Sequence, residues 1–253
     1  MLTENKTLYV YQSDIDVYNA MAIDEYLLQC VSSGEYSTAV HIYSWGRPGI
    51  TLGRFTPSDV LKNPCSIDVT RRITGGNALY HKDDIAYGIV MKLSDNKNVG
   101  LELCRKVSQI IQNVFSALKV DTQIISRERN LNNRRLACNE TFSRCELVYS
   151  DEKKAAAAAQ KNNRTAILQQ GSVYLNHKPE NINEYLTDGC GIVNTQNNLN
   201  LDKNDFMQKL SAEFLSEFGV RQINCSLCEK QEVIKNLINK KYGAEEWVWQ
   251  NFK

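Results

Sequence analysis

The stretch RRITGGNALYHKDDIAYGIV, residues 71–90, is the part of the sequence that decides how the rest is interpreted. Two arginines precede a Thr-Gly-Gly-Asn turn, and an apolar run with one histidine, His81, follows it. Adjacent glycines permit a positive φ and let a ligand approach the backbone without meeting a Cβ atom. Successive backbone N–H groups in such a loop can form a concavity for anions, and Arg71 and Arg72 add fixed positive charge. The stretch therefore predicts a loop that holds a carboxylate, a phosphate or a thioester carbonyl, although the glycines alone also fit an ordinary hairpin turn.

Length and composition are those of an ordinary globular protein. The 253 residues are 42% hydrophobic and 23% charged, which fits a single domain spanning 1–253. The net charge of +1 gives no reason to expect nucleic acid or a membrane as the partner. The first ten residues, MLTENKTLYV, are too polar for a signal peptide, and no apolar run reaches the length of about 18 residues that spans a bilayer. The eight cysteines are then expected to be reduced thiols of a cytoplasmic protein.

Two local clusters depart from this average. Cys225 and Cys228 form one CxxC pair with no second pair and no histidine cluster, so we expect a structural role and no metal site. Four arginines gather in a short segment that is either a solvated loop or a docking surface for an acidic protein. These are Arg127, Arg129, Arg134 and Arg135.

Hydrophobic periodicity predicts a mixture of strands and helices along the chain. We expect strands at 8–11, 39–45, 50–55, 66–76, 77–91, 145–151 and 167–176, and helices at 16–34, 102–120, 204–219 and 230–243. Turn chemistry at 46–49 predicts a hairpin-like connection between two of the strands. From about residue 200 the chain becomes helical. The order of these elements indicates an α+β domain and not a doubly wound sheet.

Five consecutive alanines, Ala155 to Ala159, lie between Lys154 and Gln160. Alanine has the highest helix propensity, so the run taken alone would be assigned to a helix. The strand-like sequences on either side favour a hairpin crossing instead. We therefore predict that the alanine run connects a strand on each side of it.

The 71–90 stretch resembles the signature loop of the lipoate–protein ligase and octanoyltransferase superfamily. The matching residues are Arg71, Arg72, Thr74, Gly75, Gly76, Ala78, His81 and Tyr87. Asn77 replaces the third glycine of the ligases, where the transferases commonly carry an arginine. The run MAIDEYLL resembles the first helix of the superfamily, and Trp45 corresponds to a strand beside its acyl pocket. The resemblance implies a biotin/lipoate protein ligase-like catalytic domain with mostly antiparallel sheets and packing helices.

Residues 136–175 are similar to the octanoyltransferase branch of this superfamily. A cysteine after an alanine, a Ser-Arg pair, a lysine six residues before a glutamine, and a Gln-x-Gly-Ser strand follow in the same order. These are Cys138, Ser143, Arg144, Lys154, Gln160, Gln169, Gly171 and Ser172. The chain departs from the pattern in two places, because the family usually has a glycine at Ala157 and often a histidine at Gln170. The extra methyl group of Ala157 would lie close to the expected substrate path.

The resemblance implies that Cys138 and Lys154 are the catalytic pair. A thiolate is a good nucleophile, and a nearby ammonium favours the thiolate and can donate to a developing oxyanion. The residues expected to bind substrate are Trp45, Arg71, Arg72, Thr74, Gly75, Gly76, Asn77, His81, Gln160 and Gly171. The alternative for Cys138 is a small buried apolar residue, and Lys153 is a rival for the role of Lys154.

The expected activity is transfer of an octanoyl or lipoyl group from acyl carrier protein, through a cysteine acyl-enzyme, to a lysine of a lipoyl domain. The acceptors implied are the glycine cleavage H protein or the E2 subunits of 2-oxoacid dehydrogenases. The protein would act as a monomer without a cofactor. An ATP-dependent lipoate–protein ligase, which needs ATP and Mg²⁺ and no cysteine at position 138, is the second hypothesis. A catalytically inactive carrier-binding homologue is the third, because of the alanine tract.

Overall fold

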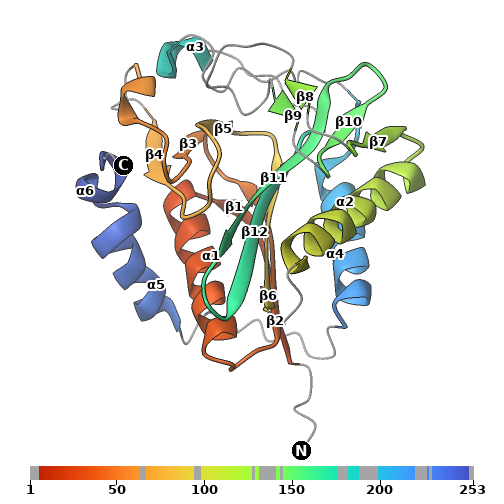
Figure 1. The fold of residues 1–253 in the computed structure, drawn as a ribbon. Helices are drawn as coiled ribbons and strands as arrows, with labels where there is room; N and C mark the ends of the chain where they lie inside the picture. Colours follow the sequence, from red (N-terminus) through yellow and green to blue (C-terminus); the bar gives the residue numbers. More distant parts are fainter. Residues whose placement is uncertain are drawn as a thin grey trace, which may run out of the picture.

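The computed structural model describes residues 6–62, 67–93, 98–126, 129–130, 141–142, 145–175, 182–187, 199–219, 227 and 230–250. Its strands are β1 (Thr7–Ile15), β2 (Thr38–Trp45), β3 (Gly49–Leu52), β4 (Asp68–Arg71), β5 (Leu79–His81), β6 (Ile85–Lys92), β7 (Thr122–Ile124), β8 (Arg129–Asn130), β9 (Thr141–Phe142), β10 (Leu147–Tyr149), β11 (Lys154–Asn162) and β12 (Ala166–Val173). Its helices are α1 (Val17–Ser32), α2 (Val99–Ala117), α3 (Ile182–Tyr185), α4 (Lys203–Glu217), α5 (Gln231–Leu237) and α6 (Glu245–Val248), with a 3₁₀ turn η1 (Ser58–Val60) and a π-helical turn η4 (Ile238–Tyr242). The α+β class predicted from the sequence is confirmed (Figure 1).

A seven-stranded sheet forms the centre of the fold, with the strand order β1-β2-β6-β12-β11-β10-β7. β1 and β2 are parallel, and the other neighbouring pairs in this sheet are antiparallel. The parallel pair is possible because α1 carries the chain from the end of β1 back to the start of β2. Asp16 caps the first turn of α1 by accepting the backbone N–H of Asn19 at 2.8 Å.

Helices cover both faces of this sheet (Figure 1). Side chains alternate between the faces along each strand, so one strand contributes side chains to the hydrophobic core on each face. On β2, Ala39 and Tyr43 join the core under α1 and α5, whereas Val40 and Ile42 join the core under α2 and α4. This division explains why β2 is buried almost throughout.

A second sheet of three strands, in the order β4-β3-β5, carries the Gly-Gly loop, which we define as residues 72–78. The hairpin predicted at 46–49 is wrong, because β2 belongs to the large sheet and β3 to the small one. The glycines there serve close packing instead. A Cβ atom on Gly49 would lie 2.6 Å from Cγ1 of Val17, and one on Gly46 would lie 2.6 Å from the carbonyl oxygen of Asp14.

The Gly-Gly loop is not a hairpin turn either, because β3 lies between β4 and β5. The single strand expected at 77–91 is also wrong, since β5 joins the small sheet and β6 joins the large one. The break falls at residues 82–84, where the side chain of Asp84 accepts the backbone N–H of Lys82 at 3.2 Å. This local hydrogen bond replaces a ladder bond and turns the chain from one sheet to the other.

The alanine tract is not a helix, but the crossing predicted there is wrong, because the tract belongs to β11 and pairs with β12 from Ala156 opposite Val173 to Asn162 opposite Ile167. The predicted helices at 16–34, 102–120, 204–219 and 230–243 correspond to α1, α2, α4 and α5 with η4. Cys138, the CxxC pair and the side chains of the four-arginine cluster lie outside the described residues. In the described ranges no helix is both long and apolar enough to cross a membrane.

Candidate active site

A cavity of about 240 Å³ opens where the small sheet meets the large one. The Gly-Gly loop, β2, β3, β5, β11 and β12 all contribute to its wall. The volume is below the range of about 300–1,000 Å³ that is typical of pockets for drug-sized ligands, which suits a short, narrow ligand. Of the residues predicted to bind substrate, those that line it are Trp45, Arg72, Gly76, His81 and Gly171.

A column of aromatic rings runs from the protein core to this cavity. His41, Tyr43 and Trp45 are alternate residues of β2, so their side chains point to the same face of the sheet. The ring centroids are 4.3 Å apart for the first pair and 5.1 Å apart for the second, and Trp45 lies 4.2 Å from the ring of His81. Tyr43, Trp45 and His81 line the cavity, whereas His41 is fully buried behind them.

Arg72 braces the Gly-Gly loop from inside. Its guanidinium donates to the carbonyl oxygens of Gly75 at 2.8 Å and Asn77 at 2.7 Å. It also donates to the carbonyl oxygen of Thr51 at 2.9 Å and to the hydroxyl oxygen of Thr51 at 3.1 Å. Gly76 takes a positive φ of 86°, as the sequence predicted for this turn. The arginine therefore holds the loop in shape while it forms part of the cavity wall.

Arg71, the other arginine of the predicted site, is directed away from the cavity. Its guanidinium donates to the carbonyl oxygens of Gly53 at 2.8 Å, Thr56 at 2.6 Å and Val248 at 2.8 Å. Burial lowers its pKa, and the positive charges of Arg72 and Arg54 lower it further. The role of Arg71 here is to join the small sheet to the C-terminal helix α6.

Lys154, predicted to be catalytic, is fully buried at the start of β11. Its Nζ lies 3.0 Å from Oε2 of Glu146, whose side chain is 8% exposed. Glu146 lines the cavity and Lys154 does not. The ion pair therefore links the buried lysine to a residue of the cavity wall, and Glu146 was not among the residues predicted from the sequence. The signal was present, since Glu146 is a charged residue beside the buried run Leu147–Tyr149.

Thr74 reaches a buried polar network and not the cavity. Its hydroxyl donates to Oε1 of Gln170 at 2.7 Å, and Nε2 of Gln170 donates to Oδ2 of Asp24 at 2.7 Å. Asp24 lies on α1 and is fully buried. Gln170, which stands where the family often has a histidine, thus ties the Gly-Gly loop to the first helix and also lines the cavity.

Gln160 and Gly171 have packing roles. The side-chain amide of Gln160 donates to the carbonyl oxygen of Gly100 and to Oε1 of Gln169, each at 2.7 Å, and so joins α2 to β11 and β12. A Cβ atom on Gly171 would lie 2.3 Å from the ring of Tyr87. Gly75 and Asn77, the remaining predicted residues, belong to the loop that Arg72 braces and are not part of the cavity wall.

The described cysteines include two whose environment opposes thiolate formation. Burial raises the pKa of the Cys30 thiol, and burial together with the neighbouring Cys145 raises the pKa of Cys104 to about 12. A reactive cysteine needs the opposite environment, one that is electropositive and partly exposed. Neither thiol fits the role of a nucleophile at neutral pH.

A family model described as the lipoyl protein ligase A/B catalytic domain matches residues 16–226 of the chain. The chain belongs to this family. The match includes the first helix, the Gly-Gly loop, Cys138, Lys154 and the β11–β12 hairpin. The family resemblance inferred from the sequence is therefore confirmed.

Curated relatives in this family carry the name octanoyltransferase LipM. The chain is 25% identical to that of an Exiguobacterium species over 260 aligned residues, which cover 91% of this chain and 93% of the relative. It is 24% identical to that of Staphylococcus aureus, with 93% and 95% of the two chains covered.

Solved structures with a similar fold are lipoate–protein ligases. Lipoate-protein ligase A bound with ATP superimposes with a TM-score of 0.77 at 16% identity and covers 98% of this chain and all (100%) of that one. A bi-partite lipoate protein ligase from Thermoplasma acidophilum, studied with its E2 lipoyl domain, superimposes with a TM-score of 0.76 at 15% identity and covers 98% of both chains. At these identities the structures confirm the biotin/lipoate ligase-like fold and do not distinguish transferase from ligase.

Proposed function

We propose that this protein is an octanoyltransferase of protein lipoylation, which takes octanoyl from acyl carrier protein and passes it to a lysine of a lipoyl domain. The observation that carries the proposal is a small cavity walled by the Gly-Gly loop in a member of this family. The match to relatives named octanoyltransferase, over nine-tenths of both chains, supports transfer of octanoyl.

Two acyl-transfer steps make up the proposed reaction. Sγ of Cys138 attacks the thioester carbonyl of the donor, so a new C–S bond forms and the thiol of the carrier leaves. The amine of the acceptor lysine then attacks the enzyme thioester, so a C–N bond forms, the C–S bond breaks and Cys138 is released. Neither step consumes ATP or needs a metal ion.

Lys154 acts on Cys138 in this scheme by favouring the thiolate and by donating to the oxyanion. Its ion pair with Glu146 offsets part of its charge, so we expect the oxyanion contribution to be the larger of the two. The basic residues Arg127, Arg129, Arg134 and Arg135 are proposed to dock acidic acyl carrier and lipoyl domains. Such steering weakens as salt rises, because exposed charges are screened over about 8 Å at physiological ionic strength.

The decisive experiment is mass spectrometry of the protein after incubation with octanoyl-acyl carrier protein and no acceptor. We expect one octanoyl group on Cys138, removable by hydroxylamine and absent in Cys138→Ala. Cys104→Ala is the matched control and should keep the adduct, because burial raises the pKa of this thiol to about 12.

The alternative is the ATP-dependent ligase, which is supported by the similarity of the fold to that of a ligase bound with ATP. A ligase would attach lipoate to the acceptor only with ATP and would tolerate Cys138→Ala. A protein that binds the carrier without forming either product would be an inactive homologue. Each outcome is seen directly in the mass of the enzyme and of the acceptor.

A further inference from the structure

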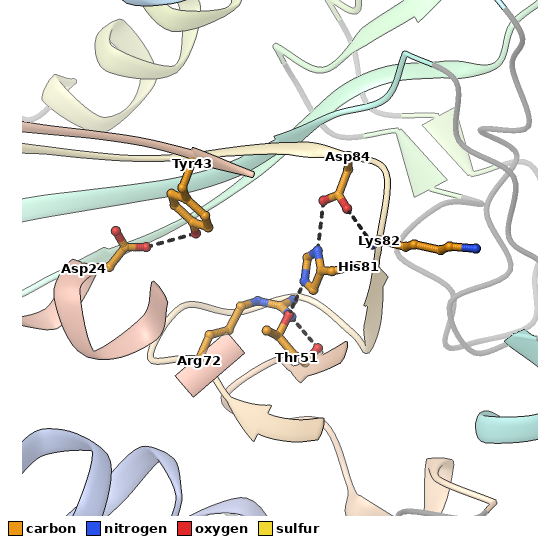
Figure 2. A network of polar contacts seen from close by, with 7 residues as sticks. All are labelled: Asp24, Tyr43, Thr51, Arg72, His81, Lys82 and Asp84. Atoms are coloured by element: carbon orange, nitrogen blue, oxygen red, sulfur yellow. Dashed lines mark hydrogen bonds and ion pairs between the residues drawn. The ribbon is translucent and has the colours of Figure 1, made fainter. Parts of the chain in front are cut away.

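Three side chains on the small-sheet side of the cavity form a continuous hydrogen-bonded chain (Figure 2). Oδ2 of Asp84 lies 2.9 Å from Nδ1 of His81, and Nε2 of His81 lies 2.8 Å from the hydroxyl oxygen of Thr51. Asp84 is fully buried, and Thr51 and His81 line the cavity. A carboxylate, an imidazole and a hydroxyl in this order are the parts of a proton relay.

Neighbouring hydrogen-bond donors determine which atom donates in each of these two hydrogen bonds. The Asp84 carboxylate only accepts, and the backbone N–H of Lys82 donates to its other oxygen at 3.2 Å, so the proton between Asp84 and His81 belongs to Nδ1. Arg72 donates to the hydroxyl oxygen of Thr51 at 3.1 Å. The Thr51 hydroxyl is then free to donate to Nε2, which keeps its lone pair.

The proposed acyl transfer needs a group with this property. A lysine side chain has an ordinary pKa of about 10.4, so the acceptor arrives as an ammonium that must lose a proton before its nitrogen can attack. We propose that His81, oriented by Asp84 and reached through the Thr51 hydroxyl, accepts the proton of the incoming amine. The inference rests on the proposed function, because it assigns the base of that reaction.

The acceptor ammonium loses two protons during the transfer. The hydroxyl proton of Thr51 moves to Nε2 of His81 while the hydroxyl oxygen takes one proton from the acceptor ammonium, and His81 later releases its proton to solvent. The neutral amine attacks the carbonyl, the C–N bond forms, and the C–S bond to Cys138 breaks. The second proton moves from nitrogen to the departing sulfur, which leaves a neutral amide and a thiol.

The charges facing His81 suit this cycle. Asp84 stabilises the imidazolium that forms after the proton is taken, as the aspartate of a catalytic triad does. Arg72 donates to the Thr51 hydroxyl oxygen and favours return of the proton, and Glu146, which also lines the cavity, favours a cationic acceptor there. The Lys82 side chain points away from the imidazole (Figure 2).

A second histidine–aspartate pair, which lies in the core, serves as an internal control. His41 forms a similar pair with Asp24, with Nδ1 2.8 Å from Oδ1, but it lies in the core and does not line the cavity. Asparagine places its amide nitrogen close to the position of the histidine Nδ1 and has nothing at the position of Nε2. His81→Asn and His41→Asn therefore each preserve donation to the aspartate and remove the part of the ring that carries the second nitrogen.

The experiment is a single-turnover assay in which enzyme already carrying octanoyl on Cys138 is mixed with a lipoyl domain. Removing a general base typically costs a factor of about 10²–10⁴, so His81→Asn should slow transfer to lysine at least 100-fold while the adduct still forms. His41→Asn should transfer at close to the wild-type rate. Thr51→Val should be slow and Thr51→Ser should recover most of the rate, because only the hydroxyl matters.

Hydroxylamine separates a proton-transfer role from a structural one, since it is mostly unprotonated at neutral pH and needs no base. His81→Asn enzyme should lose its octanoyl group to hydroxylamine as fast as wild type does. Equal slowing with lysine and hydroxylamine, or wild-type transfer by His81→Asn, would overturn the inference. Failure of the proposed function looks different, because wild-type enzyme would then form no adduct on Cys138 at all.

Discussion

The described part of the chain holds two buried histidine–aspartate pairs whose geometry is alike and whose surroundings differ. His81–Asp84 stands on the cavity wall, and its second ring nitrogen meets the hydroxyl of Thr51 at 2.8 Å. His41–Asp24 lies under α1, and its second ring nitrogen meets the amide oxygen of Gln12 at 3.1 Å. A hydroxyl can donate and leave a lone pair on the ring, whereas an amide oxygen only accepts. Each pair contains an aspartate, and the two pairs differ in the partner of Nε2. The hydroxyl partner suits His81 to proton transfer, and the amide partner suits His41 to a structural role.

The two pairs are also physically joined. The ring column His41–Tyr43–Trp45–His81 connects them on one side. On the other side Gln170 donates a hydrogen bond to Asp24 and accepts one from the hydroxyl of Thr74 in the Gly-Gly loop. The core pair thus supports the loop that walls the cavity, and the difference between the pairs can be tested by removing each in turn.

The largest difference in stability is expected between Asp24→Ala and Asp84→Ala. Asp24 accepts from His41 and Gln170, so its loss leaves several buried polar groups without an acceptor and should cost about 3–5 kcal/mol. Asp84→Ala should cost about 1–3 kcal/mol, because its histidine lies beside the cavity, where water can compensate. Urea denaturation of the two variants measures the difference. Equal losses would show that the two pairs are equivalent supports of the fold.

A smaller effect is expected from adding one methyl group behind the core pair. A Cβ atom on Gly88 would lie 2.3 Å from Oδ1 of Asp24, so Gly88→Ala must displace the carboxylate that binds His41. Overpacking of this kind costs about 1–3 kcal/mol. Gly75→Ala is the control, because nothing lies within 4 Å of the added methyl group. Thermal unfolding should show a lower midpoint for Gly88→Ala alone, and a pair of identical melting curves would contradict the packing at Asp24.

The smallest effect concerns the link between the two regions. Thr74→Val removes the hydroxyl that binds Gln170 and should cost about 0.5–1.5 kcal/mol, whereas Thr74→Ser should keep the bond. Amide hydrogen exchange of residues 72–78 should become faster in the valine variant, because the loop has lost its tie to α1. Unchanged protection would mean that Arg72 alone holds the loop.

Much of the secondary structure could be predicted from local patterns. The amphipathic spacing of α2 and the stop at Gly34, which takes a φ of 84°, are both found in the structure. For the alanine tract, the neighbouring sequences correctly argued against a helix, but the tract is itself a strand and not the crossing that they predicted. Its strand pairs residue by residue with β12, so tertiary pairing overrides the intrinsic preference.

The errors share one physical cause. Turn chemistry at 46–49 and the apolar run at 77–91 show where the chain bends or extends, but not which sheet each strand joins. That choice depends on contacts with residues distant in sequence, such as Gly49 against Val17 and Thr51 against His81. A hairpin at 46–49 and a single strand at 77–91 would each have kept the chain in one sheet. In the structure the chain passes from one sheet to the other in both places.

The sequence by itself determined the family, the α+β class and the loop at the cavity, because these depend on residue types at fixed spacing. Only the tertiary structure showed that Arg71 binds backbone carbonyls, that Glu146 pairs with Lys154 and lines the cavity, and that Thr51 faces His81. In the last case the partners are 30 residues apart and lie on neighbouring strands. A motif fixes which side chains are available, whereas the direction of each hydrogen bond is fixed by how the sheets bring them together.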